Sequence, residues 1–151
     1  MQIDSNSFPS PNSRVYTGQV LVVDDEPHIV TMACTMLESQ GFRAKGCHSG
    51  EAALIHIESA HQMQQDRFDV MVLDLTLPGG MSGFDALEAV KRYDPEIAVI
   101  ACSGYFQEDA RDLCQAIGFA DILQKPYSIE ALCAIVRRCL AREKSSAYAA
   151  A

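Results

Sequence analysis

The chain of 151 residues has a formal net charge of −8, and 48% of its residues are hydrophobic. This length suits one domain with a core of its own. Nucleic acid and membrane are not expected as direct partners, because Lys and Arg dominate binding to nucleic acid and no apolar run approaches the roughly 18 residues of a membrane span.

Polar segments are predicted at both ends of the chain. Residues 1–18 are rich in Ser, Asn and Pro and lack the apolar centre of a secretory signal, so we predict a flexible tail there. A second tail is predicted at 143–151, which leaves 19–142 as the domain. The six cysteines include no C-x-x-C pair. They are interpreted as small buried residues of a protein in a reducing compartment, the cytoplasm.

Between the tails, short apolar runs alternate five times with helical patterns. Pro27 follows the first run closely and suits the first turn of a helix that Gly41 ends. Ser49 is predicted to cap the second helix. Strands are predicted at 19–24, 42–47, 68–73, 97–102 and 121–124. Helices are predicted at 27–40, 50–60, 83–93, 107–117 and 128–142.

The alternation of strand and helix favours an α/β fold, in which helices cover both faces of a parallel sheet. We expect a doubly wound five-stranded sheet with the flavodoxin-like strand order 2-1-3-4-5, whose switch point lies between the first and third strands. Helical spacing indicates the inward side chains of the third and fourth helices. These are Phe84, Leu87, Val90, Ala110, Leu113, Cys114 and Ile117.

Polar residues stand at the ends of four of the five strands. Asp24 and Asp25 follow the first strand, Asp74 the third, Ser103 the fourth and Lys125 the fifth. Because parallel strands point the same way, their carboxyl ends gather at one edge of the sheet, where open α/β sheets bind ligands. The sequence therefore predicts three carboxylates, a hydroxyl and an ammonium in one site, although the aspartates could also act only as caps and turns.

Three adjacent carboxylates repel one another and raise one another's pKa values. Shared protons would relieve this repulsion, and so would a divalent cation such as Mg²⁺, which prefers oxygen ligands. Lys125 cannot neutralise three acids alone, but it can hold an anion that a substrate brings. The set therefore indicates phosphoryl transfer, with Asp74 as the candidate nucleophile and the Ser103 hydroxyl as a donor to a phosphoryl oxygen.

Five pieces of the sequence, in register with the strand–helix repeats, are similar to one known family. They are Val22-Val-Asp-Asp-Glu-Pro, Val72-Leu-Asp-Leu-Thr-Leu-Pro, Ser82-Gly-Phe-Asp, Ser103-Gly and Gln124-Lys-Pro. From Gln19 to Leu140 the chain resembles the receiver domain of two-component response regulators. One Asp-Asp pair would be a weak signal, whereas all five pieces in order are a specific one.

The resemblance implies a phosphoacceptor and a metal site. Asp74 resembles the phosphoacceptor and is also a metal ligand. Asp25 resembles the direct ligand of Mg²⁺ or Mn²⁺, and Asp24 holds the metal mainly through water. The backbone carbonyl of Thr76 resembles the third protein ligand.

The resemblance also implies that Ser103 and Lys125 bind the phosphoryl group, and that the bond from Lys125 to Pro126 is often cis. Ser103 and residue 122 would form the conformational switch. Residue 122 is usually aromatic in the family, and here it is Ile122, which can repack but has no ring. Tyr105, two residues after Ser103, is predicted to lie at the mouth of the site and slow the entry of water, with plain exposure as the alternative.

The loop from Pro78 to Gly83 also departs from the family, because it is one residue longer than the commonest form. Its glycines are interpreted as a flexible turn rather than a phosphate cradle, since the lysine and hydroxyl of a P-loop are absent. The serine at position 103 stands where threonine is commoner.

The resulting hypothesis is a single-domain receiver that takes its phosphoryl group from a phosphohistidine on a histidine kinase or a phosphotransfer protein. It would assist only its own phosphorylation and dephosphorylation, and would bind a downstream protein through helix 107–117, strand 121–124 and helix 128–142. Alternatives are a receiver domain from a hybrid histidine kinase, a degenerate receiver and a phosphatase of the haloacid-dehalogenase type. The basic cluster of Arg137, Arg138, Arg142 and Lys144 is interpreted as solubilising charge near a helix C-terminus.

Overall fold

The computed structural model describes the backbone of residues 18–149 and the side chains of residues 18–142. Within this range five parallel strands form one sheet in the order β2-β1-β3-β4-β5, which confirms the predicted doubly wound, flavodoxin-like fold. The tail predicted at 1–18 lies outside the described residues, apart from Gly18. The strands are β1 (Gln19–Val23), β2 (Arg43–Cys47), β3 (Val70–Asp74), β4 (Ala98–Ser103) and β5 (Asp121–Gln124).

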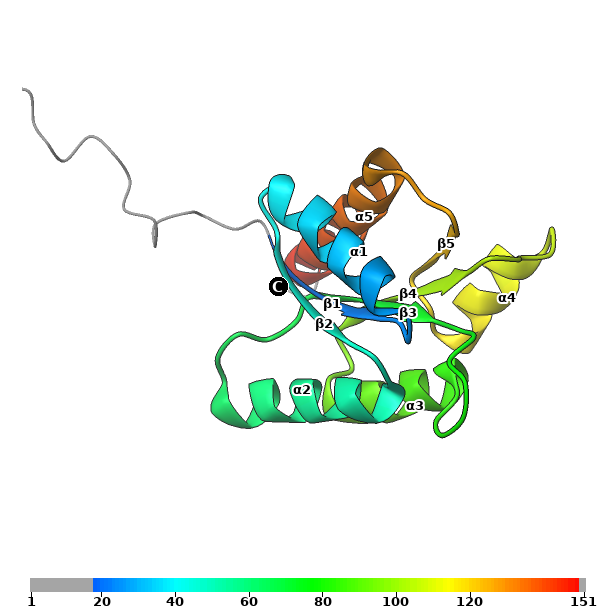
Figure 1. Ribbon diagram of the computed structural model, residues 1–151. Helices are drawn as coiled ribbons and strands as arrows, with labels where there is room; N and C mark the ends of the chain where they lie inside the picture. Colours follow the sequence, from blue (N-terminus) through cyan, green and yellow to red (C-terminus); the bar gives the residue numbers. More distant parts are fainter. Residues whose placement is uncertain (1–17, 150–151) are drawn as a thin grey trace, which may run out of the picture.

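Helices cover both faces of the sheet (Figure 1). On one face lie α1 (Pro27–Ser39) and α5 (Ile129–Ala149), and on the other lie α2 (Gly50–Met63) and α3 (Gly83–Tyr93). The short helix α4 (Ala110–Ile117) lies beside β5 at the edge of the sheet. Across residues 18–149, none of these helices has both the length and the apolar content that a membrane span requires.

Each face of the sheet has its own hydrophobic core. Val20 and Val22 belong to the cluster under α1 and α5, whereas Leu21 and Val23 belong to the cluster under α2 and α3. Successive side chains of a strand point to opposite faces, so burial of both faces explains why β1 is continuously apolar.

The sheet register sets the strand ends side by side. Val23, the last residue of β1, pairs with Leu73 of β3, so Asp24 and Asp74 both follow directly after this pair. Asp74 in turn pairs with Cys102, and Ser103 pairs with the residue just before Lys125. The polar residues at the carboxyl ends of β1, β3, β4 and β5 therefore follow one another along the same edge.

Local sequence signals position the helices as predicted. The Ser49 hydroxyl accepts a hydrogen bond from the Ala52 amide (3.1 Å), and the Ser82 hydroxyl accepts one from the Asp85 amide (3.1 Å). These bonds satisfy free amides in the first turns of α2 and α3. Gly41, just after α1, has φ = +90°, a conformation in which glycine avoids the strain of a Cβ.

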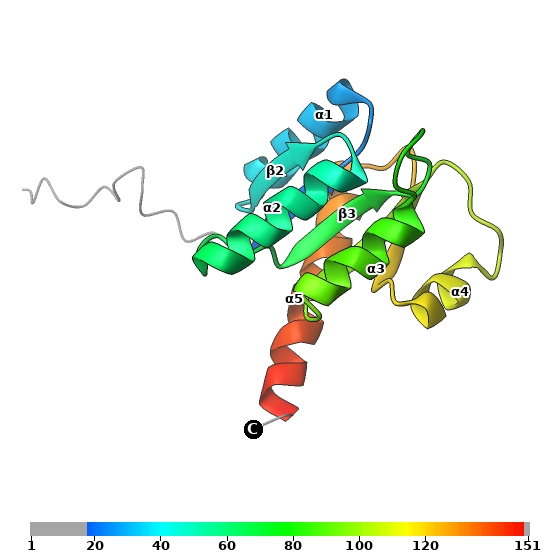
Figure 2. The ribbon, with the colours of Figure 1, turned by 90° about the horizontal axis from the view of Figure 1, so that it is seen from below.

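Three helix boundaries differ from the predictions by more than one residue. α5 continues to Ala149 instead of ending at residue 142, and Figure 2 shows its last turns extending beyond the rest of the fold. The segment after residue 140 contains Ala, Arg, Glu and Lys, all good helix formers, so part of the predicted C-terminal tail is helical. α4 begins at Ala110 rather than at residue 107, because residues 108 and 109 form a turn. α2 ends at Met63, beyond the predicted residue 60.

Three of the side chains predicted to face the core are exposed instead. Leu113 and Ile117 are more than half exposed and Phe84 is about half exposed, whereas Ala110 and Cys114 are buried. Because α4 lies at the edge of the sheet, only one line of its side chains reaches the core. The spacing of apolar residues therefore predicted a wider buried face for α4 than the structure has.

The basic cluster of α5 makes contacts within the domain. The Arg137 guanidinium lies 5.5 Å from the ring centroid of Phe42. Arg138 lies 3.9 Å from the buried carboxylate of Asp121, and Arg142 donates to a backbone carbonyl (3.2 Å). The fourth basic residue lies outside the described side chains. These contacts join α5 to its neighbours. Because α5 continues to Ala149, the three described arginines lie within the helix and not near its C-terminus, where the cluster was predicted.

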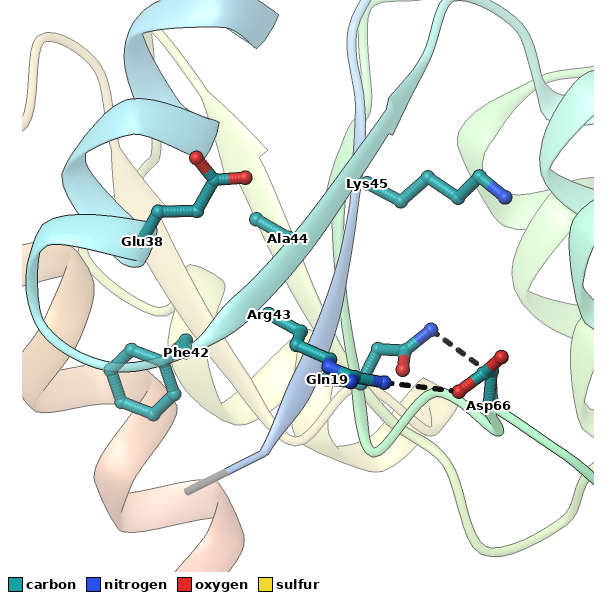
Figure 3. Close-up of a pocket in the computed structure, with 7 residues that line it drawn as sticks. All are labelled: Gln19, Glu38, Phe42, Arg43, Ala44, Lys45 and Asp66. Carbon is teal, nitrogen blue, oxygen red and sulfur yellow. Dashed lines mark hydrogen bonds and ion pairs between the residues drawn. The ribbon is translucent and has the colours of Figure 1, made fainter. Parts of the chain in front are cut away.

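A hollow of about 520 Å³ lies at the starts of β1 and β2, at the opposite end of these strands from the acidic residues (Figure 3). The Asp66 carboxylate accepts a hydrogen bond from the Arg43 guanidinium (3.1 Å), and the Asp66 carbonyl accepts one from the Gln19 side-chain amide (3.0 Å). These bonds tie the starts of the two strands to the connection between α2 and β3.

The packing of α1 on β2 leads to a stability prediction. A Cβ added at Gly46 would overlap Cγ1 of Val30, and the β-branched Val30 cannot easily rotate away. We expect Gly46→Ala to lower the free energy of unfolding by about 1–3 kcal/mol, the usual range for overpacking, in a urea titration. Val30→Ala removes the overlapped methyl groups, so the double variant should be more stable than the sum of the single effects implies. Simple additivity would contradict the overlap.

Candidate functional site

Three carboxylates converge at the carboxyl edge of the sheet. Asp24 and Asp25 follow β1 and Asp74 ends β3, and one oxygen of each lies within 4.8 Å of the others. Asp24 and Asp74 are only 3% and 2% exposed, whereas Asp25 is exposed. The structure thus brings together the three acids that the sequence placed in one site, and leaves one of them open to solvent.

Lys125 bridges two of these acids from the loop after β5. Its Nζ lies 2.6 Å from Oδ2 of Asp24 and 3.2 Å from Oδ2 of Asp74. Burial by itself would lower the pKa of Lys125, but the hydrogen bond and negative charge of Asp24, together with those of Asp74, outweigh burial and raise it. Lys125 is therefore a permanent positive charge between the carboxylates.

Asp24 also has a local structural role. Its Oδ1 accepts a hydrogen bond from the Glu26 amide (3.0 Å), where α1 begins, while its Oδ2 contacts Lys125. This bond forms a turn before α1 rather than a helix cap, because the N-cap residue is Glu26 and α1 has no side-chain cap bond. Nδ1 of His48, the residue after β2, lies 3.1 Å from the Asp24 backbone carbonyl. No pattern in the sequence predicted this contact.

Both carboxylate oxygens of Asp74 have hydrogen-bond donors. Oδ1 accepts from the Thr76 amide (2.9 Å) and from the Thr76 hydroxyl (2.8 Å), and Oδ2 accepts from Lys125. The sequence assigned a role only to the carbonyl of Thr76, so its side chain is an addition to the predicted site. A donor on each oxygen therefore holds the carboxylate in one orientation.

Ser103 is buried at the end of β4, and its hydroxyl is bonded to the next loop. It donates to the Tyr105 carbonyl (3.2 Å) and accepts from the Tyr105 amide (3.3 Å). The Ser103 carbonyl accepts a hydrogen bond from the Lys125 amide (2.8 Å), so the two predicted phosphate ligands are joined through the backbone. The Tyr105 side chain is 75% exposed.

The remaining predicted switch residue, Ile122, is partly buried in β5 and packs against the core cluster under α2 and α3. The peptide bond between Lys125 and Pro126 is cis, as the resemblance implied. Ile122 therefore packs among the apolar side chains of this core cluster.

The donor set fits a hard divalent cation. Three carboxylates against one ammonium leave two uncompensated negative charges, and carboxylate and carbonyl oxygens are the ligands that Mg²⁺ and Mn²⁺ prefer. Cys102 pairs with Asp74 in the sheet, and burial raises the pKa of its thiol to about 12. The thiol therefore stays protonated, and no soft thiolate from Cys102 competes with the oxygen ligands.

The family model of the response regulator receiver domain matches residues 20–137, and the chain belongs to this family. Receiver domains are signalling domains of two-component systems that interact with histidine kinases and downstream effectors. They typically bind Mg²⁺ at an acidic pocket, and Asp24, Asp25 and Asp74 form an acidic cluster in this chain.

Several relatives are similar to this chain. The nitrogen assimilation regulatory protein NtrX of Azorhizobium caulinodans is 30% identical over 122 residues, which cover 80% of this chain and 26% of that protein. The response regulator SaeR of Staphylococcus aureus is 29% identical over 125 residues, which cover 83% of this chain and 51% of that protein. The chain thus spans about a quarter to a half of the length of these curated relatives.

One solved structure is matched over nearly the whole length of its own chain. The chemotaxis protein CheY4 of Vibrio cholerae matches with a TM-score of 0.71 at 26% identity, over 81% of this chain and 98% of that one. NtrX of Brucella abortus, at 24% identity, matches with a TM-score of 0.79 over 89% of this chain and 29% of that one, and supports the fold.

The crowding of carboxylates leads to a metal prediction. Asp25→Asn should stabilise the metal-free protein, because it removes one of three repelling charges, and should lose most of the stabilisation by Mg²⁺. For the wild type we expect the melting temperature to rise with MgCl₂, by an amount equivalent to about 2.7 kcal/mol at a hundredfold excess over Kd. Thermal melts with and without MgCl₂ measure both effects.

The control is Asp112→Asn, which removes one negative charge from an exposed position on α4 and should behave as the wild type. Equal Mg²⁺ stabilisation of Asp25→Asn and Asp112→Asn would contradict the site.

Proposed function

We propose that this receiver accepts a phosphoryl group at Asp74 from a phosphohistidine on a histidine kinase or a histidine phosphotransfer protein. An oxygen of Asp74 attacks phosphorus, the P–N bond breaks, and the imidazole leaves with the electron pair of that bond. The product is an acyl phosphate that water later hydrolyses. The observation that carries the proposal is the convergence of Asp24, Asp25 and Asp74 with the Lys125 ammonium at the carboxyl edge of the sheet.

Lys125 and Ser103 are proposed to hold the phosphoryl oxygens. The raised pKa of Lys125 keeps its ammonium charged at every physiological pH. The charged ammonium would exchange a carboxylate oxygen for a phosphoryl oxygen. The Ser103 hydroxyl would exchange the Tyr105 carbonyl for a phosphoryl oxygen, and this exchange would release the loop between β4 and α4. Ile122 would repack as that loop moves.

The metal belongs to the same proposal. Asp25, Asp74 and the Thr76 carbonyl would hold Mg²⁺ or Mn²⁺ directly, and Asp24 would hold it through water. When bound, the cation supplies positive charge that offsets the carboxylates and the phosphoryl oxygens. The protein residues themselves orient Asp74, through Thr76 on one oxygen and Lys125 on the other.

The alternatives fit less well. A haloacid-dehalogenase-type phosphatase needs a carboxylic acid two residues after its nucleophile, and Thr76 at that position donates to Asp74 instead. A degenerate receiver would lack part of this set, whereas here the three acids lie together and Lys125 contacts two of them, Asp24 and Asp74. We therefore propose a signalling module rather than a turnover enzyme.

A single-domain receiver of the size of CheY4 is the form that we propose, whereas NtrX and SaeR are longer proteins. The same site would serve a receiver domain within a hybrid histidine kinase. Detection of the protein in its own cells distinguishes the two forms by chain length. The proposal includes a cytoplasmic location, since the free thiols of the chain are typical of a reducing compartment.

A groove beside Lys125 offers a surface to the phosphoryl donor. It has a volume of about 390 Å³, and its lining includes Ile29, Met32, Pro126 and Tyr127. Because Lys125 lines the groove and also contacts Asp74, a donor protein that packs on its apolar part can bring a phosphohistidine to the carboxylate.

The output surface is proposed to be α4, β5 and α5. Leu113 and Ile117 of α4 are exposed, and the loop before α4 is bonded to the Ser103 hydroxyl through Tyr105. A change at Ser103 would therefore move the start of α4. A downstream protein that contacts this surface would detect the change.

The central test is metal-dependent labelling. The purified protein should gain the mass of one phosphoryl group after incubation with acetyl phosphate and MgCl₂, because Asp74 is the acceptor. Asp74→Asn should gain none, and Asp112→Asn should be labelled as the wild type. Unchanged mass for the wild type would refute the proposal, and repeated turnover of p-nitrophenyl phosphate without a kinase would favour the phosphatase.

Tyr105 is proposed to slow the entry of water to the acyl phosphate. We expect Tyr105→Ala to dephosphorylate several-fold faster than the wild type and Tyr105→Phe to keep the wild-type rate, because the ring rather than the hydroxyl shields the site. Decay of the labelled species, followed by intact mass after removal of acetyl phosphate, measures these rates. Equal rates for all three proteins would leave Tyr105 merely exposed.

A further inference from the structure

The loop between β3 and α3 folds back onto α2. Gly79 and Gly80 both have positive φ, +65° and +55°, in the region where residues with a Cβ are strained. The loop, which is longer than the common form by one residue, therefore turns sharply at this pair. It then lies beside the first turn of α2 (Figures 1 and 2).

A carboxylate of α2 holds the loop there. Oε1 of Glu51 accepts a hydrogen bond from the Met81 amide (2.8 Å). The approach is close, since a Cβ added at Gly80 would lie 2.7 Å from the same oxygen. A Cβ at Gly50 would meet the Met81 side chain at 3.3 Å. The loop and the helix thus meet without space for additional atoms.

Both ends of this loop belong to the site. At its start, Thr76 donates its amide and its hydroxyl to Asp74. At its end, a Cβ added at Gly83 would lie 3.0 Å from Cα of Leu75 and 3.3 Å from the Asp74 carbonyl oxygen. The backbone around Asp74 and Thr76 is therefore packed against the end of a loop whose middle is fixed by Glu51.

We propose that Glu51 is a positioning residue for the metal site. Its carboxylate fixes the loop through Met81, and so fixes the direction of the Thr76 carbonyl that takes part in cation binding. The inference rests on the proposed function for the identity of the cation ligands. Glu51 touches neither the cation nor the phosphoryl group, and it acts only by restricting the loop before the cation binds.

Three variants test this role. Glu51→Ala removes the acceptor, and Glu51→Gln keeps an oxygen acceptor for the Met81 amide while removing the charge. Glu58→Ala is the matched control, since Glu58 lies on the same helix and its carboxylate accepts from Gln62 of that helix. All three remove one negative charge, so they separate the hydrogen bond from the overall electrostatic effect.

Two readouts do not require phosphorylation. Hydrogen exchange of the Met81 amide in metal-free buffer should be faster in Glu51→Ala than in the wild type, and close to wild type in the other two variants. The Kd for Mg²⁺, measured by calorimetry, should rise about tenfold in Glu51→Ala, the lower end of the range for residues that support metal ligands. Glu51→Gln should restore most of the affinity.

The outcomes separate this inference from the proposed function. If acetyl phosphate labels the wild type but Glu51→Ala keeps the wild-type Kd for Mg²⁺, the positioning role is overturned. The same conclusion follows if Glu58→Ala weakens Mg²⁺ as much as Glu51→Ala does. If Mg²⁺ binding follows the expected order while the wild type takes no phosphoryl group, the positioning role holds and the proposed function fails.

Discussion

The parallel sheet forces like charges together, and the ammonium of Lys125 offsets part of their repulsion. All strands end at one edge, so the acids after β1 and β3 cannot separate without a break in the register between these strands. Lys125 contacts both Asp24 and Asp74, and its single positive charge leaves the three acids and the ammonium with a net charge of −2. This imbalance costs stability in the metal-free protein and makes the edge receptive to a divalent cation. The core on both faces of β1 and β3, rather than the site, supplies the stability that keeps this arrangement.

The hydrogen bonds around Asp74 define what a phosphoryl group would have to displace. The hydroxyls of Thr76 and Ser103 and the ammonium of Lys125 all have partners in the described structure. Phosphorylation would thus exchange existing hydrogen bonds for new ones, and an exchange changes the free energy by much less than the formation of bonds from unpaired groups. The conformations with and without the phosphoryl group should therefore be close in free energy. A signalling switch needs two conformations of similar free energy.

The sequence predicted the sheet order and the acidic cluster because both follow from local patterns and one topological rule. Each strand is a short apolar run, and strand ends of a parallel sheet meet. The exposure of Leu113 and Ile117 was not predictable, because helical spacing shows which residues share a face but not how much of that face a neighbour covers. The extension of α5 was missed because composition near a terminus resembles a tail as much as a helix. The Thr76 hydroxyl was missed because its contact with Asp74 depends on the conformation of one turn.

Glu51 shows why a tertiary role can be invisible in a sequence. An acidic residue in the first turn of a helix is favoured by the helix dipole, and Glu51 lies there, just after the Ser49 cap. That local rule fully accounts for the residue type, so the sequence gives no reason to look for a second partner. The Met81 amide lies 30 residues further along the chain, and the contact forms only because α2 and the loop after β3 pack side by side. The helix dipole explains why a carboxylate is found at this position, whereas the hydrogen bond to the loop explains why that carboxylate has one defined orientation.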